Sequence, residues 1–149
     1  MNNNGWRSTR WARPALIVLL AVDLLLFAGG ATAHRHIPIP LGFTTWVEPR
    51  VVPASFVEGA GALALATALV GVVTWAGWAR GVTWAALWYC FAGVLWGMAR
   101  LAMGSIPEAR TITNDFLHIA MTLVTTLALA RLALASGERP RQDEKGHRP

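Results

Sequence analysis

The segment that decides the fold is "PALIVLLAVDLLLFAGGATA", residues 14–33, in which Asp23 is the single charged residue. A helix of about 20 predominantly apolar residues is long enough to cross the hydrocarbon core of a bilayer. Three further segments have the same character, at about 54–78, 82–103 and 114–134. The sequence therefore predicts an all-α membrane protein, in which residues 14–135 form an antiparallel bundle of four transmembrane helices.

The distribution of charge supports a membrane protein over a soluble one. Only 14% of the residues are charged and 54% are hydrophobic, whereas about a quarter of the residues of a soluble domain are charged. The charges gather in a basic N-terminal segment, residues 1–13, in the loops, and in a polar tail, residues 136–149, which we expect to be disordered. The basic residues flank apolar spans, so we expect the lipid bilayer, and not nucleic acid, as the partner.

The flanking Lys and Arg residues also predict the orientation, because cytoplasmic loops carry an excess of them. The side that holds both termini has nine: Arg7, Arg10, Arg13, Arg80, Arg131, Arg139, Arg141, Lys145 and Arg148. The opposite side has four: Arg35, Arg50, Arg100 and Arg110. Both termini are therefore predicted to be cytoplasmic. The predominance of Arg indicates a bacterial source, hence a multi-pass protein of the bacterial inner (plasma) membrane.

The first span has a second interpretation. Its basic start, its short apolar run and the sequence Ala31-Thr32-Ala33 also fit a signal peptide cleaved after residue 33. Asp23 interrupts the apolar run, which a disposable targeting segment does not need. We therefore favour a retained span.

Polar residues recur near the outer ends of the spans, and their helical spacing predicts that they lie on the inward faces of the helices. Glu58, Arg100, Asp115 and His118 all lie within about two turns of that boundary and predict a pocket that opens outward, covered by the loop that follows the first span. Asp23 lies near mid-membrane, where a carboxyl group is costly, and is a candidate proton relay. Structural alternatives stay open. Glu58 and Arg100 could form an ion pair that fixes helix register, Asp115 could stabilise a helix start, and Asp23 could be neutral and hydrogen-bonded.

Other patterns give weaker indications. Gly93 and Gly97 have the G-x-x-x-G spacing that lets helix backbones approach closely. His34, His36 and His118 are types of side chain that bind zinc or copper, but their spacing matches no metal motif, so a metal site is not favoured. No nucleophile–base pair or phosphate-binding loop is evident, so we do not expect an enzyme acting on its own.

The stretch "SFVEGAGALALATALVGV", residues 55–72, resembles the DoxX-like family of small four-helix bacterial membrane proteins. The likeness consists of the four-span layout and a Glu near the start of the second helix, here Glu58, followed by a Gly-rich run. The His- and Pro-rich first loop and "TNDFLH", residues 113–118, depart from it. The resemblance implies a membrane subunit associated with redox or quinone-linked partners.

Three functional hypotheses follow from these patterns. The first is a small binding or accessory subunit whose pocket takes a quinone-like ligand, with Arg100 and His118 hydrogen-bonding its carbonyl groups. The second is a proton-coupled transporter of a small solute that acts as a homo-oligomer and uses Asp23. The third is an assembly protein whose Gly93/Gly97 face docks a larger membrane protein.

Overall fold

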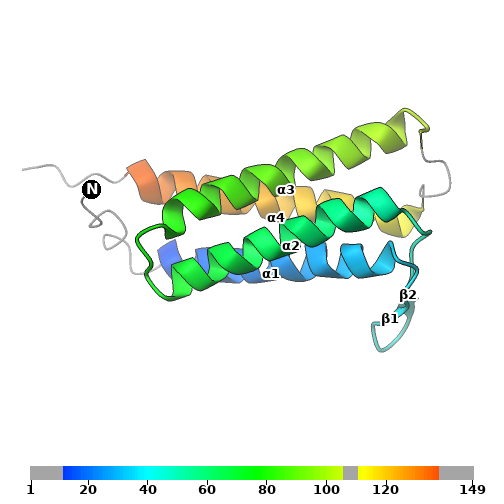
Figure 1. Cartoon of the computed structure of the whole chain (residues 1–149), viewed down its shortest axis with the longest axis horizontal. Coiled ribbons are helices and arrows are strands. Elements are labelled where there is room, and N and C mark those ends of the chain that lie inside the picture. Colours follow the sequence, from blue (N-terminus) through cyan, green and yellow to red (C-terminus); the bar gives the residue numbers. More distant parts are fainter. Residues whose placement is uncertain (1–11, 106–110, 138–149) are drawn as a thin grey trace, which may run out of the picture.

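Four long helices make up most of the protein. The computed structural model describes residues 12–105 and 111–137, and its helices are α1 (Ala12–Ala33), α2 (Val52–Val73), α3 (Ala79–Ala102) and α4 (Ile112–Gly137). Successive helices alternate in direction, and each packs against two neighbours in the cyclic order α1, α2, α3, α4 (Figure 1). All four are long and apolar enough to cross a membrane. The predicted all-α four-helix bundle with four candidate membrane spans is therefore confirmed.

The outward faces of the helices are apolar, as a lipid environment requires. Leu25, Leu63, Trp96 and Leu123, one from each helix, all expose more than half of their surface. Such exposure on every helix exceeds the small apolar patches of soluble monomers and matches burial in lipid. The core lies along the bundle axis, where apolar side chains from all four helices pack on one another, among them Leu20, Leu65, Leu87 and Leu132.

The second helix ends five residues earlier than predicted, at Val73 instead of residue 78. The chain turns there because Trp75 adopts a left-handed backbone conformation, with φ of 58°. Arg13 stabilises this end from α1. Its Nη2 atom donates a hydrogen bond to the carbonyl of Val72 at 2.8 Å, and its guanidinium lies 3.4 Å from the centre of the Trp75 ring. A cation at the carbonyl end of a helix and over an indole face is favourable on both counts.

The other helix boundaries agree with the predicted spans within a few residues. Helix α3 begins at Ala79, before the predicted residue 82. Helix α4 begins at Ile112, because the Thr111 hydroxyl accepts a hydrogen bond from the Asn114 N–H at 3.0 Å and caps the helix. It continues through Gly137, two residues into the segment predicted as a disordered tail. The rest of that tail and most of the predicted basic N-terminal segment lie outside the described residues.

The connection between α1 and α2, residues 34–51, folds into a small hairpin that we call the hairpin loop. Strands β1 (Ile39–Pro40) and β2 (Thr45–Trp46) pair antiparallel. The turn between them includes Gly42, whose φ of 86° suits a residue without a side chain. Figure 1 shows the hairpin loop projecting beside the end of α1, and we call this end of the bundle the hairpin end.

Candidate functional site

A cavity of about 160 Å³ lies between α2 and α3 at the hairpin end of the bundle. Three polar residues line it: Glu58 from the start of α2, Arg100 from the end of α3 and His118 from the first turns of α4. The rest of its lining is apolar or glycine, including Phe27 of α1. Three of the four residues predicted to line a common pocket thus share one cavity.

The fourth, Asp115, lies elsewhere. Its side chain is exposed and borders a separate hollow with Met98 and Ile119. The reason is the helical period, because two residues three positions apart differ by about 60° around the helix axis. His118 therefore points inward while Asp115 points outward. Asp115 occupies the first turn of α4, where the helix dipole favours a negative charge.

The Glu58 side chain is buried and faces a histidine. Its Oε1 atom lies 3.6 Å from Nε2 of His34, which follows the end of α1. No ion pair joins Glu58 to Arg100, so the register-fixing pair considered from the sequence does not form. Within the described part of the chain the Oε2 atom of Glu58 accepts no hydrogen bond. Glu58 thus lines the cavity, while its unpaired oxygen is buried against Gly30 of α1, where an added Cβ would lie 2.7 Å from it.

His118 is held by its own helix. Its Nδ1 atom lies 2.8 Å from the carbonyl oxygen of Asn114, one turn earlier. Because a carbonyl oxygen only accepts hydrogen bonds, Nδ1 carries the proton in this contact. The other ring nitrogen, Nε2, faces Gly97 of α3, where an added Cβ would lie 3.3 Å away. This contact fixes the orientation of the ring and makes Nδ1 the donor.

Gly93 and Gly97 belong to the same cavity wall. A Cβ added at Gly93 would lie 3.1 Å from Cγ1 of Val57 on α2, and both glycines line the cavity. Their G-x-x-x-G spacing therefore brings α3 close to its neighbours within this chain. It also leaves the space that the cavity occupies.

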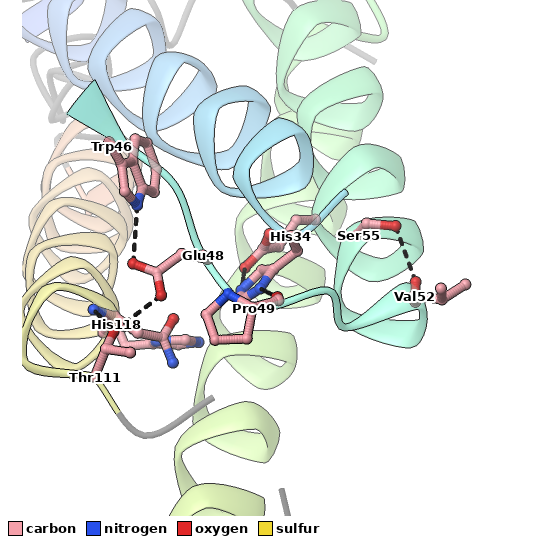
Figure 2. A network of polar contacts seen from close by, with 10 residues as sticks. His34, Trp46, Glu48, Pro49, Val52, Ser55, Thr111 and His118 are labelled. Atoms are coloured by element: carbon pink, nitrogen blue, oxygen red, sulfur yellow. Dashed lines mark hydrogen bonds and ion pairs between the residues drawn. The ribbon is translucent and has the colours of Figure 1, made fainter. Parts of the chain in front are cut away.

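Glu48 attaches the hairpin loop to this end of the bundle. The Glu48 carboxylate accepts one hydrogen bond from Trp46 Nε1 and another from the Thr111 hydroxyl of the α4 cap, each at 2.9 Å (Figure 2). Only 1% of Glu48 is exposed, so a charge-bearing side chain is buried with two donors. The Trp46 ring lies against Gly29 of α1, where a Cβ would approach it to 2.8 Å.

Sequence reasoning missed this role of Glu48. The signal that could have found it is modest: Glu48 is the one acidic residue between positions 34 and 51. Its burial depends on how the hairpin loop folds back onto α4. That fold-back joins residues far apart in the sequence, so no local pattern reveals it.

The histidines of the hairpin loop differ from each other. His34 is buried beside Glu58, and its Nδ1 contacts the carbonyl of Pro49 at 3.5 Å. Burial lowers the pKa of His34; nearby His118 lowers it further, while the Pro49 carbonyl and Glu48 oppose the shift. His36 is exposed, with a left-handed backbone. Among the described residues no three His, Cys, Asp or Glu side chains are grouped to hold a metal ion.

Asp23 lies deeper in the bundle and does not line the cavity. It is fully buried, and the Thr125 hydroxyl of α4 lies 3.0 Å from Oδ1 and 2.9 Å from Oδ2. Phe27, one turn closer to the hairpin end, lines the cavity in its place. The Phe27 side chain, and not Asp23, therefore forms this part of the cavity wall.

The exposed lining residues indicate where the cavity opens. Val57 of α2 and Trp96 of α3 both line it and both face the surface, with 37% and 64% of their area exposed. Pro53, in the first turn of α2, is also exposed. These residues lie on the lipid-facing side of two candidate spans, so the opening faces laterally between α2 and α3.

Fold and site together define a four-span helical membrane bundle with an apolar, partly polar-lined cavity near one end. Compared with protein-family models, curated proteins and solved structures, the chain matches none of them. The resemblance to the DoxX-like family accordingly stays a prediction from the sequence.

Proposed function

We propose that this protein is a small integral membrane binding or accessory subunit that holds a quinone-like ring in the cavity between α2 and α3. The observation that carries the proposal is the meeting of Glu58, Arg100 and His118, from three helices, in one otherwise apolar cavity. Ligand sites commonly combine apolar walls with a few placed polar groups. The count of flanking Arg and Lys residues supports an orientation with this end outside the inner membrane.

The size of the cavity supports a ligand with a single ring. An apolar cavity of about 150 Å³ accommodates one benzene molecule, and the cavity here is about 160 Å³. A ring would fill it, and an attached alkyl chain would leave between Val57 and Trp96 into the lipid. Arg100 is half-buried, and its guanidinium forms no hydrogen bond or ion pair with another described residue, so it supplies a donor at the rim.

The two rival hypotheses have less support. The docking hypothesis needs Gly93 and Gly97 on an outer surface, whereas they line the cavity. The transport hypothesis needs a path to Asp23, which is buried behind Phe27 and hydrogen-bonded to Thr125.

A pair of glycine variants of α3 tests the proposal. Gly97→Val places a side chain in the cavity beside His118, whereas Gly81→Val, in the same helix, meets nothing within 4 Å. The protein in lipid nanodiscs is titrated with a decyl-substituted benzoquinone and with the corresponding hydroquinone. We expect at least one of the two to bind the wild type and Gly81→Val. Gly97→Val should bind it at least tenfold more weakly. Equal binding by both variants, or binding of neither probe to the wild type, contradicts the proposal.

A further inference from the structure

Some polar atoms that line the cavity donate hydrogen bonds and others accept them. Their character determines which polar groups of a ring ligand can be hydrogen-bonded. We infer that the cavity recognises a membrane-soluble phenol or hydroquinone by its hydroxyl group, in preference to a ligand that offers only carbonyl or ether oxygens. The inference rests on the proposed function, because it concerns the occupant of the same cavity.

The first acceptor is Nε2 of His118. The Nδ1 proton of that ring is committed to the Asn114 carbonyl at 2.8 Å. In the neutral imidazole the other nitrogen then carries a lone pair and accepts a hydrogen bond. Nε2 lies at the cavity wall formed by Gly97. This changes the expectation from the sequence, in which His118 would donate to a carbonyl group.

The second acceptor is the carboxyl group of Glu58. His34 uses Nδ1 to contact the Pro49 carbonyl, so in its neutral form Nε2 presents a lone pair to Glu58 Oε1 at 3.6 Å. When Glu58 holds a proton, that proton is best placed on Oε1, facing His34. The other oxygen, Oε2, is then an acceptor whether Glu58 is charged or neutral. Oε2 has no hydrogen-bond partner among the described residues, but it is buried against Gly30 of α1, where an added Cβ would lie 2.7 Å from it. Nε2 of His118 is therefore the acceptor on which the selection rests.

A ligand that supplies a hydrogen-bond donor satisfies this acceptor, and one that lacks a donor leaves it unpaired. Sites built to hydrogen-bond a hydroxyl group reject analogues without it more strongly than apolar pockets reject an added methylene. Arg100, which only donates hydrogen bonds, can donate one to the same hydroxyl oxygen or to a second oxygen on the ring. The acceptor on His118 and the donor on Arg100 together match the hydroxyl group of a phenol or a hydroquinone.

Three probes that differ in one group test this inference. The wild-type protein in nanodiscs is titrated with 4-decylphenol, with its methyl ether 4-decylanisole, and with decylbenzene, which lacks the oxygen and is smaller. We expect 4-decylphenol to bind at least tenfold more tightly than both other probes. In His118→Phe, which keeps a ring of similar size without an acceptor, this preference should fall several-fold, whereas the exposed-site control His36→Phe should keep it.

The possible results distinguish a failure of this inference from a failure of the proposed function. Equal binding of all three probes overturns the selection for a hydroxyl group and leaves the cavity as a binding site. If decylbenzene binds tightly and 4-decylanisole binds weakly, the cavity discriminates by the size of the ring substituent and not by the hydroxyl group, and the inference is overturned as well. Binding of none of the three, and of neither quinone form, contradicts the proposed function itself.

Discussion

Replacing Thr125 by Val removes the hydrogen bond that joins α4 to Asp23 on α1. The Thr125 hydroxyl lies 3.0 and 2.9 Å from the two carboxyl oxygens, and both side chains are fully buried. Interhelical hydrogen bonds in membrane proteins contribute about 0.6 kcal/mol on average and up to about 1.7 kcal/mol. A buried acceptor left without its donor costs about 1–3 kcal/mol. We therefore expect Thr125→Val to lower the free energy of unfolding by about 1–2 kcal/mol.

The neighbouring Thr126 provides a matched control. Its side chain is exposed, and its hydroxyl donates to the Thr122 carbonyl of its own helix, so Thr126→Val should change stability by less than about 0.5 kcal/mol. Reversible unfolding in mixed detergent–lipid micelles, followed by circular dichroism, measures both variants. The double variant Asp23→Val/Thr125→Val removes acceptor and donor together. It should be more stable than the single variant Thr125→Val, in which Asp23 is left buried without its donor. Equal destabilisation by Thr125→Val and Thr126→Val would refute the reasoning.

Three further predictions concern the ends of the bundle. Glu48→Ala removes two hydrogen bonds and should raise amide exchange of the hairpin loop several-fold, unlike Thr45→Ala at an exposed site; unchanged exchange would contradict the role of Glu48. Because burial lowers the pKa of His34, the unfolded chain takes up the proton first, so stability should fall as pH drops through about 6.5. His34→Gln should reduce this pH dependence and His36→Gln should not; the reverse result excludes His34 as its source. Arg13→Met, which loses the contacts with α2, should lower the free energy of unfolding by about 1–2 kcal/mol, and a change below 0.5 kcal/mol would contradict its capping role.

The fold could be predicted from the sequence because long apolar segments separated by charged ones have few structural solutions in a bilayer. The inward direction of α1 could also be read, since Asp23, Phe27 and His34 fall on one helical line and all three are buried. The end of α2 could not. The apolar sequence continues past Val73, and the turn depends on the backbone conformation of Trp75, which a hydropathy pattern does not report.

The candidate site was predicted in part, for an equally physical reason. Glu58, Arg100 and His118 share a cavity because they lie at similar depth on inward faces, and depth and face are both readable from helical spacing. Asp115 lies outside the cavity because it is offset from His118 by about 60° around the helix axis. The position of Glu48 could not be predicted, because it depends on a contact between the hairpin loop and the residue that caps α4.

The central claim is that the cavity between α2 and α3 holds a ligand, and a native mass spectrum of the protein, gently extracted from its own membranes, tests it most directly. The account predicts an added mass on the 16.1 kDa chain, corresponding to a lipophilic single-ring compound. The same mass should remain bound to Gly81→Val and be lost from Gly97→Val. A bare chain in all three spectra, or an added mass that Gly97→Val retains in full, would contradict the claim.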